Sequence, residues 1–420
     1  MKAILPKIKF KNFYEKWNRK KLQSIAPLRG GFAFKSEKFQ DSGIPIVRIS
    51  NIKFDGTVGG EFEYYSKVNP DEKFVLRGRS ILLAMSGATT GKIAMLDSEE
   101  EYYQNQRVGY FQNTKAVDYD FLSSILQTKE FTNQLNSVLV AGAQPNISSK
   151  EIDSFVFCIP ESLDEQSALG SLFRTLDNLL ASYKDNLVNY QSLKATMLSK
   201  MFPKAGQTVP EIRLDGFEGE WECLKIAEIF QIIDGDRGKS YPGESDFYSV
   251  GHTLFLDTGN VKKSGLDFST TKFISEEKDK ELRNGKLILG DFILTSRGTL
   301  GNVAYYNENI QKRYSSVRIN SAMLILRPLL GDKISPDYIL AVLRGNLISD
   351  FMKVNQVGSA QPHITKKEFS KIKVLVPSNI QEQQAIGSYF SNLDNLINTY
   401  QEKISKLETL KKKLLQDMFI

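Results

Sequence analysis

Apolar residues recur at alternating steps of about four and three in two long segments of the chain. In the first segment they are Leu169, Phe173, Leu176, Leu180, Tyr183, Leu187, Tyr190, Met197 and Met201. In the second they are Ile386, Phe390, Leu393, Ile397, Tyr400, Ile404, Leu407, Leu414 and Met418. This a/d spacing over about five heptads predicts two coiled-coil helices rather than two surface helices. Each seam has one gap at the same place, filled by Lys194 and Lys411.

Both segments begin with a helix-start signal. Ser162 with Glu165, and Asn379 with Glu382, have the spacing of a capping box and follow a proline that ends the preceding strand. A helix of about 40 residues is about 60 Å long, so one small domain cannot bury its seam. We expect the two helices to pair antiparallel, with the globular parts at opposite ends and facing in opposite senses.

Two points about these helices stay open in the sequence. The alternative to pairing is that each helix packs only on its own domain. The apolar pairs that end the segments, at 201–202 and 418–419, are expected to fill a core rather than to bind a partner.

The regions between these segments carry short apolar runs punctuated by glycine, aspartate and asparagine. Runs beginning at Ile44, Ile81, Leu254, Ile293 and Ala322 predict β-strands. Short helices are expected over 121–136 and 337–353. The predicted fold class is α/β (α+β), with two pseudo-symmetric globular domains that contain twisted mixed β-sheets and are joined by the two long helices.

The chain is a tandem duplication. Pro6, Ile8, Phe13 and Trp17 recur 204 positions later as Pro210, Ile212, Phe217 and Trp221. AQPNIS from Ala143 returns 217 positions later as AQPHIT from Ala360, and the same shift relates the two long segments. We therefore expect globular domains over 1–160 and 204–377, with long-helix spacers over 161–203 and 378–420.

The ends of the two repeats match well, whereas their middles diverge. This pattern favours two equivalent platforms that perform different versions of one task. Neutral drift of a duplicated domain is the alternative, but drift by itself would not spare the ends.

Charge and cysteine usage narrow the class of protein. A formal charge of +6 and a pI near 8.9 lean toward a polyanionic partner, although many cytosolic proteins share them. Cys158 and Cys223 are the only cysteines, so a structural zinc site and a disulfide framework are excluded. The first residues have no apolar stretch long enough for a signal peptide, and the sequence has no run of about 18 apolar residues. We therefore expect a cytoplasmic protein.

The sequence offers no constellation for catalysis. His252 and His363 are the only histidines, and Asn146 stands where the other repeat has His363. A GxSxG elbow, an Asn-Pro-Pro-aromatic tetrad and a cofactor loop of the usual glycine spacing are all absent from it. We expect a non-catalytic chain that has no cofactor and no metal of its own.

The loop 86–92 superficially matches a phosphate-binding P-loop. Only three residues separate Gly87 from Gly91, however, where four are needed, and Ile93 follows Lys92 in place of serine or threonine. The equivalent loop of the second repeat has no lysine. Nucleotide hydrolysis is therefore not expected.

Two loop motifs recur in the divergent middles and are candidates for contacting DNA. Asn51-Ile52-Lys53 matches Asn260-Val261-Lys262, and 86–92 aligns with 296–302. Hydroxyl groups and backbone N–H groups of such loops can approach phosphates, while arginine and asparagine can reach base edges. The full candidate set is Lys35, Arg48, Asn51, Lys53, Ser86, Thr89, Lys92, Asn105, Arg107, Arg237, Lys239, Asn260, Lys262, Arg297, Arg313 and Arg318. Taken singly, each of these side chains is more often a solvated surface group.

In combination, the motifs resemble those of type I restriction–modification specificity subunits. They are the two Pro-x-Ile-(Lys/Arg)-(Phe/Leu)-x-x-Phe-x-x-x-Trp openings, GFAFKSEKF from Gly31, VRISNIK from Val47, SGATTGK from Ser86, and the AQPNIS/AQPHIT pair followed by proline and a Glu-Gln helix. The likeness spans essentially all 420 residues.

The resemblance implies two target-recognition domains held by an antiparallel coiled coil, each reading one half of a bipartite double-stranded DNA sequence with an unspecific spacer. It also implies two modification subunits, which carry S-adenosylmethionine and methylate adenine, and restriction subunits that use ATP to translocate and cut DNA. Recognition domains of this family diverge strongly, so base-reading residues cannot be transferred by motif.

Two other functions stay open. One is a self-contained modification enzyme with an unfamiliar active site, and the other is a coiled-coil interaction protein with no role in nucleic-acid binding. Methyl transfer by the purified chain alone would identify the enzyme. The half-site sequences and the spacer length are not specified by the sequence.

Overall fold

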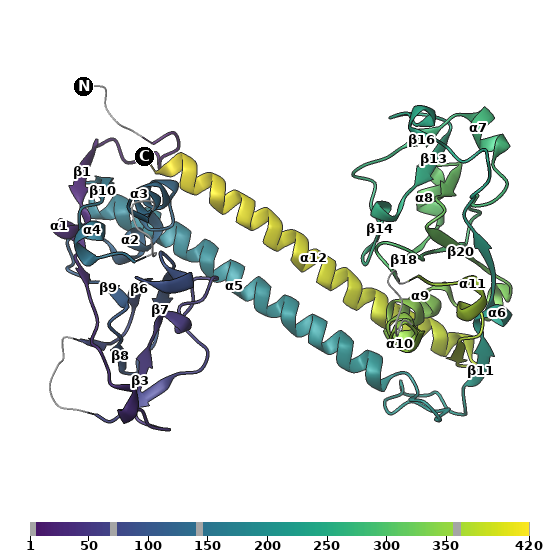
Figure 1. The fold of residues 1–420 in the computed structure, drawn as a ribbon, viewed down its shortest axis with the longest axis horizontal. Coiled ribbons are helices and arrows are strands. Elements are labelled where there is room, and N and C mark those ends of the chain that lie inside the picture. Colours follow the sequence, from purple (N-terminus) through teal and green to yellow (C-terminus); the bar gives the residue numbers. More distant parts are fainter. Residues whose placement is uncertain (1–5, 68–73, 140–145, 356–362, 420) are drawn as a thin grey trace. The chain divides into compact units, whose positions relative to one another are not determined.

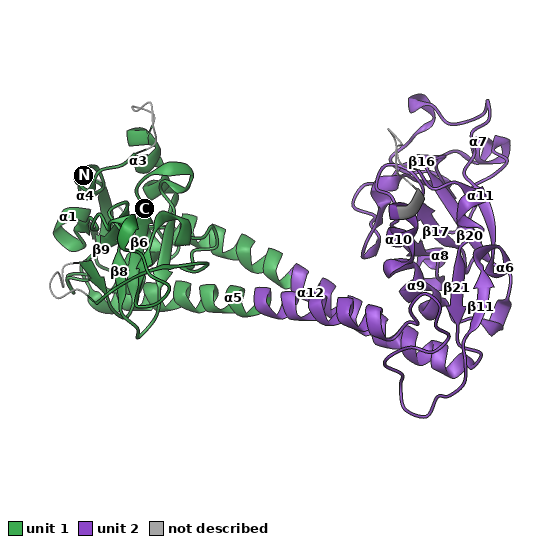
Figure 2. Cartoon of the chain, turned by 60° about the horizontal axis from the view of Figure 1, so that its bottom comes forward, with its two compact units in different colours: residues 1–183, 403–420 green, residues 184–402 purple. Residues whose placement is uncertain are grey.

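The computed structural model describes residues 6–67, 74–139, 146–355 and 363–419. They divide into two compact units, unit 1 with Met1–Tyr183 and Lys403–Ile420, and unit 2 with Lys184–Glu402 (Figure 2). Each unit thus combines one globular part with segments of both long helices.

The described part of unit 1 contains three β-sheets. Its strands are β1 (Trp17–Lys21), β2 (Leu28–Arg29), β3 (Ile44–Val47), β4 (Glu63–Tyr65), β5 (Val75–Leu76), β6 (Ser80–Ala84), β7 (Ile93–Leu96), β8 (Tyr102–Gln104), β9 (Val108–Phe111) and β10 (Val156–Pro160). The strand orders are β2-β9-β6-β7, β4-β3-β8-β5 and β1-β10. β3 and β8 run parallel and the other pairs antiparallel, which confirms the predicted mixed sheets.

Unit 2 repeats this arrangement with local changes. Its strands are β11 (Glu222–Lys225), β12 (Phe230–Asp234), β13 (Thr253–Leu256), β14 (Val261–Lys262), β15 (Gly265–Leu266), β16 (Phe273–Ile274), β17 (Phe292–Thr295), β18 (Val303–Tyr305), β19 (Val317–Ile319), β20 (Met323–Pro328) and β21 (Lys373–Val376). The orders are β12-β20-β17-β18, β16-β13-β19, β14-β15 and β11-β21. Among the described strands of this unit, β13 and β19 are the pair that runs parallel.

Buried apolar runs place the central strands. Every residue of β6 is buried, and its side chains alternate between two cores. Ile81 and Leu83 face the core that contains the helices, whereas Leu82 and Ala84 face a core shared with Val47 of β3. A strand buried on both faces reads as a continuous apolar run, as this one does in the sequence.

The short helices are more numerous than the sequence predicts. They are α1 (Leu22–Ile25), α2 (Tyr119–Ile125), α3 (Lys129–Leu139) and α4 (Ser149–Asp153) in unit 1, and α6 (Ile226–Ile229), α7 (Glu276–Glu281), α8 (Glu308–Arg313), α9 (Pro336–Arg344), α10 (Asn346–Asn355) and α11 (Lys366–Phe369) in unit 2. The single helices expected over 121–136 and 337–353 are each two helices, because the chain leaves the helix after α2 and at Gly345, which follows α9. No described helix is long and apolar enough to cross a membrane.

The long helices α5 (Leu163–Lys200) and α12 (Ile380–Met418) pack together (Figures 1 and 2). In unit 1 the Lys403 ammonium lies over the Tyr183 ring, and Phe419 contacts Phe173. In unit 2 the Tyr190 and Tyr400 rings lie 5.6 Å apart. Residues later in α5 contact residues earlier in α12, so the two helices pack antiparallel, as predicted. Packing of each helix on its own domain alone is excluded.

The seam residues are buried to different degrees. Leu169, Phe173, Leu176, Leu180, Phe390 and Leu393 are buried, whereas Tyr183, Leu187, Ile397, Tyr400, Ile404 and Leu407 are half-buried. Of the buried ones, Leu169, Phe173 and Leu176 belong to the core of unit 1, and Phe390 and Leu393 belong to the core of unit 2.

A polar cluster occupies each gap in the seam. In unit 1 Lys411 bonds to Asp177, and its ammonium also donates to the Gln127 side chain at 2.5 Å. In unit 2 Lys194 donates to Asp394 at 2.5 Å, and the Arg344 guanidinium lies 3.7 Å from the same carboxylate. The third members, Gln127 and Arg344, occupy equivalent positions at the end of α2 and of α9. The lysines that interrupt the apolar pattern therefore tie the helix pair to each globular part.

The apolar residues that end each long-helix segment fill a core, as predicted, and the core in each case is that of the opposite repeat. In unit 1 the Phe419 ring lies 5.7 Å from Phe121 and 6.1 Å from Trp17. In unit 2 the Phe202 ring lies 5.9 Å from Tyr338 and 6.1 Å from Trp221. The two tryptophans therefore hold equivalent places.

The starts of α5 and α12 each dock on a helix through a glutamine. The Gln166 side chain accepts from the backbone N–H of Asp118 and donates to the Pro160 carbonyl. Gln383 does the same with Ser335 and Pro377. The predicted capping boxes are confirmed only in part. Ser162 accepts from the Glu165 N–H at 3.3 Å, but the glutamate side chains at 165 and 382 bind elsewhere.

Candidate nucleic-acid interface

The loops that follow β3, β6 and β8 meet at one edge of unit 1. β3 and β8 are parallel, so their carboxyl ends lie together, and the turn 105–107 leads from β8 into β9 beside the end of β6. The Asn105 N–H donates to the Val47 carbonyl at 3.1 Å, and the Met85 N–H to the Arg107 carbonyl at 2.9 Å. These bonds bring the candidate segments 48–53, 86–92 and 105–107 together.

Unit 2 builds the same edge from the segments that follow β13, β17 and β19. The Asn320 N–H donates to the Leu256 carbonyl at 3.0 Å, and the Ser296 N–H to the Ala322 carbonyl at 2.9 Å. The backbone frame is therefore repeated although the sequences of the middles diverge.

A threonine hydroxyl fastens two of the loops together in both units. Thr89 Oγ1 donates to the Ile49 carbonyl at 3.4 Å, and Thr299 Oγ1 donates to the Thr258 carbonyl at 3.2 Å. Ser86, which opens the first of these loops, is buried and forms a β-bridge with Asn146. The Ser86 backbone and the Thr89 hydroxyl thus belong to the frame of the edge.

The two candidate asparagines Asn51 and Asn260 are buried and support the backbone. Asn51 Oδ1 accepts from the Arg48 N–H at 3.0 Å, while its amide donates to the Gly59 and Glu61 carbonyls. Asn260 makes the same three kinds of bond. Since these bonds use the whole amide group, we assign both side chains to positioning the loop rather than to contacting DNA.

Arg318 is also an internal group. Its guanidinium bonds to Asp279 and to the carbonyls of Asn284 and Leu282, and the side chain is buried in β19. Burial of an arginine requires such pairing. Arg318 therefore holds the segment after α7 and does not reach the surface that the loops form.

Several candidate cations remain available at the edge. Arg107 and Arg297 are exposed and lie in the turn and loop just described, and Lys262 is exposed at the end of β14. Arg237 is exposed and donates to the Ser321 carbonyl at 3.2 Å, beside the turn that follows β19. Lys53 is half-buried, and its ammonium donates to the Ser50 carbonyl at 3.2 Å.

Lys35 and Lys239 are exposed at equivalent positions. The chain reaches them through Gly31 and Gly235, whose backbones pass so close to the turns at Asn105 and Asn320 that a Cβ would collide with a carbonyl oxygen. These glycines bring both lysine-bearing segments up to the edge.

Arg48 and Arg313 are placed differently. The Arg48 guanidinium pairs with Glu63 of β4 at 3.2 Å. Arg313 ends α8, before the start of β19, and lies over the rings of Phe268 and Tyr314. The edge follows the end of that strand, so Arg313 lies toward its other end.

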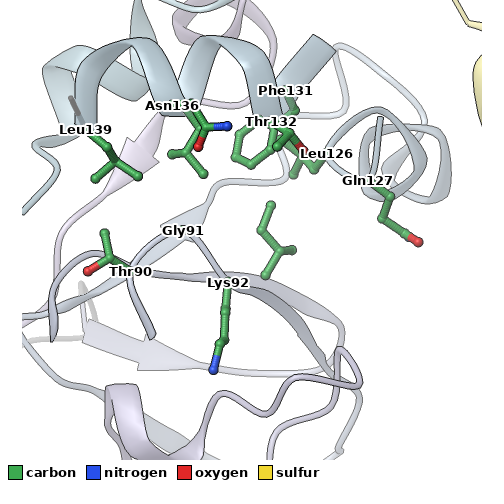
Figure 3. Close-up of a pocket in the computed structure, with 11 residues that line it drawn as sticks. Thr90, Gly91, Lys92, Leu126, Gln127, Phe131, Thr132, Asn136 and Leu139 are labelled. Carbon is green, nitrogen blue, oxygen red and sulfur yellow. The ribbon is translucent and has the colours of Figure 1, made fainter. Parts of the chain in front are cut away.

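Lys92 borders a cleft of about 440 Å³ between its loop and α3 (Figure 3). In the figure its side chain points away from α3, and its ammonium lies over the Phe54 ring. The loss of water around the ammonium lowers the pKa of Lys92. The equivalent Asn302 donates instead to the Val261 carbonyl at 2.8 Å.

The sequence hypothesis missed Asn320, the counterpart of Asn105. In both turns the asparagine Oδ1 accepts the backbone N–H two residues later, from Arg107 at 3.5 Å and from Ala322 at 2.9 Å. An asparagine three residues before a buried strand in both repeats was the available signal. Among the described residues no group of three histidine, cysteine or acidic side chains is arranged to hold a metal ion.

Comparison with known proteins gives a consistent result across most of the chain. The family model "Type I restriction modification DNA specificity domain" matches residues 14–189 and 218–409. The type I restriction enzyme MjaVIII specificity subunit of Methanocaldococcus jannaschii is 22% identical over 349 residues, which cover 82% of this chain and 79% of that protein. The EcoBI specificity subunit of Escherichia coli is 21% identical, with 97% of this chain and 86% of that protein covered.

A solved structure shares the fold. The type I restriction–modification S subunit from M. genitalium superposes with a TM-score of 0.68 at 16% sequence identity, and 99% of each chain is covered.

Proposed function

The chain belongs to the family of type I restriction–modification DNA specificity domains, and on this premise we propose that its two target-recognition domains read different halves of one bipartite target. It is a DNA specificity subunit of a type I system, and it is not itself a catalytic subunit. Binding of DNA and assembly into a type I complex follow from that membership.

The observation that carries the proposal is a repeated frame with exchanged side chains. At equivalent positions the first repeat has Lys92 and Arg107 where the second has Asn302 and Ala322. Arg297 in turn stands where the first repeat has Ser86, because the Met85 and Ser296 N–H groups donate to equivalent carbonyls. Because arginine and lysine favour guanine in the major groove and asparagine favours adenine, two such edges suit two different half-sites.

The division of labour that we propose follows the duplication. Residues 1–160 and 204–377 are the recognition domains, and 161–203 and 378–420 are the helical spacers. Of the candidate side chains, the exposed Arg107, Arg297 and Arg237 are proposed to meet DNA directly, together with lysines that meet phosphates.

The helical spacers are proposed to bind two copies of a modification subunit that carries S-adenosylmethionine, and the assembly to recruit restriction subunits that use ATP. Repeated exposed leucines support two equal docking sites. Leu179 and its counterpart Leu396 are 40% and 39% exposed, and Leu193 and Leu410 are 38% and 47% exposed. Because the same positions are exposed and apolar in both repeats, they support a docking surface of the same kind on each.

The test is to map modified bases in cells that produce the chain together with its modification subunit. Arg107→Ala is expected to relax or weaken recognition at one half-site and Arg297→Ala at the other, by about 1–3 kcal/mol for a base-reading arginine. Lys333→Ala, an exposed lysine outside the edge, is the control and should leave both halves unchanged. A variant that altered both half-sites together would contradict the two-platform proposal.

A second measurement addresses the self-contained enzyme. The purified chain, given DNA and S-adenosylmethionine, is expected to transfer no methyl group until the modification subunit is added. Transfer by the chain alone would reject the proposed role.

A further inference from the structure

The segment Lys7–Lys21 of unit 1 is strongly cationic. It contains seven lysine or arginine residues and one glutamate. All seven cations are exposed, and they are Lys7, Lys9, Lys11, Lys16, Arg19, Lys20 and Lys21. We call this segment the basic strip. Such a density of like charge on one side of a domain is the electrostatic footprint of a polyanion site.

The equivalent segment of unit 2, Glu211–Lys225, has the opposite charge. It contains five acidic and two basic residues, and we call it the acidic strip. The backbones match closely: the Ile8 N–H donates to the Asp417 carbonyl and the Ile212 N–H to the Lys200 carbonyl, both at 2.9 Å. The strand β1 pairs with β10 as β11 pairs with β21. One surface of the duplicated frame has therefore reversed its charge.

The basic strip is largely unpaired. Lys7 lies 3.6 Å from Asp417, and Lys9 lies over the Tyr14 ring. No described carboxylate forms an ion pair with the other five cations. Repulsion among unpaired cations is unfavourable in the isolated chain and is relieved when an anion binds.

The acidic strip is partly neutralised within its own unit. Glu211 pairs with Lys200 at 2.8 Å and Lys204 at 3.0 Å, and these ammonium groups lower the pKa of Glu211 to about 2. The Arg213 guanidinium donates to the Glu382 carboxylate. The acidic strip thus offers a second copy of the chain only a reduced negative charge.

The basic strip is separate from the candidate reading edge. In Figure 1 β1 and β10 lie at one end of unit 1, and β3 and β8 lie at the other. A group bound at the basic strip therefore does not occupy the loops after β3, β6 and β8.

We propose that the basic strip binds the phosphate backbone of DNA outside the two half-sites, and that unit 1 alone provides this contact. A partner that binds both repeats in the same way would require the same charges on both strips. The basic strip and the acidic strip share their apolar positions, but their charges are opposite. The partner is therefore one that meets only the first repeat. The strip adds sequence-independent affinity and goes beyond the reading of half-sites, because phosphates carry no base identity.

The experiment compares two triple variants of the full chain. Lys16→Gln/Arg19→Gln/Lys20→Gln removes three unpaired cations of the basic strip, and Glu218→Gln/Glu220→Gln/Glu222→Gln is the matched control on the acidic strip. Binding to a duplex of random sequence is followed by fluorescence anisotropy between about 50 and 200 mM salt.

The basic-strip variant should lower affinity for every duplex and make the slope of log affinity against log salt shallower by about 2 to 3, since each phosphate contact contributes about 0.9. The control should leave the slope unchanged. If the triple variant does not fold, Lys20→Gln alone should still change the slope by about 0.9. An unchanged slope in a folded variant would overturn the proposal.

Sedimentation velocity adds an independent arm. Self-association of the chain that disappears in the basic-strip variant would assign the strip to a second copy and reject DNA as its partner. The two proposals fail separately, because the mapped half-site motif depends on the reading edge, and the salt slope on random DNA depends on the strip.

Discussion

Each repeat has a buried glutamate at the start of its long helix, and the group that donates hydrogen bonds to this glutamate differs between the two repeats. In unit 1 Glu165 accepts the Trp17 indole N–H at 3.2 Å, and its second oxygen has no partner among the described residues. In unit 2 Glu382 receives two bonds from Arg213, at 2.8 and 2.7 Å, and the Trp221 indole N–H is the group left without a described partner.

The difference shows how a duplicated frame tolerates a change of charge. An arginine fork satisfies both oxygens of a carboxylate, whereas an indole offers one donor. Burial accordingly raises the pKa of Glu165. The bonds between Arg213 and Glu382 in turn raise the pKa of the arginine. Unit 2 therefore depends on an ion pair at a place where unit 1 holds a carboxyl with one oxygen that has no described partner.

Arg213→Ala should have the largest effect on this comparison. It leaves the Glu382 carboxylate, 1% exposed, without its counterion, and loss of one partner of a buried pair costs about 3–5 kcal/mol. Urea denaturation with hydrogen exchange resolved by unit should place the loss in unit 2. Arg213→Ala/Glu382→Gln should recover most of it.

Lys9→Ala is the matched control in unit 1, because Lys9 is the equivalent residue and is exposed. It should change stability by no more than about 0.5 kcal/mol. An equal loss of unfolding free energy in Arg213→Ala and Lys9→Ala would mean that the ion pair between Arg213 and Glu382 adds no stability of its own.

Gly170→Ala and Gly387→Ala should have an intermediate effect and should be equal in the two units. A Cβ at Gly170 would lie 2.5 Å from the Phe121 nitrogen, and one at Gly387 would lie 2.6 Å from the Tyr338 nitrogen. The cost of such crowding is about 1–3 kcal/mol. The exposed neighbours Ser171 and Ser388 provide controls, and their alanine variants should melt like the parent. Damage confined to one glycine variant would contradict the equivalence of the two docking sites.

Glu165→Gln should have the smallest effect and should be visible only as a pH dependence. Because the pKa of Glu165 is raised above its ordinary value of 4.5, the folded state favours the protonated acid. Its contribution to stability is present below pH 4.5 and is lost as the pH rises through the raised value.

The measurement for Glu165→Gln is the free energy of unfolding of parent and variant at a series of pH values. The glutamine keeps an acceptor for the Trp17 N–H. The free energy of unfolding of the variant should therefore rise relative to that of the parent as the pH rises from 4.5 toward neutrality. A constant difference between the two would contradict the raised pKa.

The duplication and the long helices could be predicted from the sequence because their signals are periodic. The seams at Leu169 and Phe390, the paired gaps at Lys194 and Lys411, and the apolar helix ends all follow from spacing alone. The pairing of the two helices follows as well, since one small domain cannot bury such a seam.

The partners of the gap lysines could not be predicted. Gln127 and Arg344 lie far from Lys411 and Lys194 in sequence and come together only in the folded unit. Neither residue belongs to a periodic pattern. Long-range polar clusters of this kind leave no local trace in the chain.

The sequence could predict which loops are equivalent in the two repeats, but not the surroundings of their side chains. The recurrence of 51–53 at 260–262 marks equivalent loops, but recurrence does not distinguish an internal asparagine from an exposed one. Asn51 and Asn260 are repeated because both loops need the same internal support. Arg318 was indistinguishable from a surface arginine, because its partner Asp279 precedes it by 39 positions.

The lysine–aspartate clusters also exclude a slide of one long helix along the other. An apolar seam alone would accept a shift of one heptad, but here such a shift would bring Lys411 opposite Lys184 in one direction or Gly170 in the other. Asp177 would then face Met418 or Ile404. One heptad is about 10.5 Å of helix, or about three base pairs of B-DNA. The four charged side chains Lys194, Asp394, Lys411 and Asp177 thus fix the register of the two long helices.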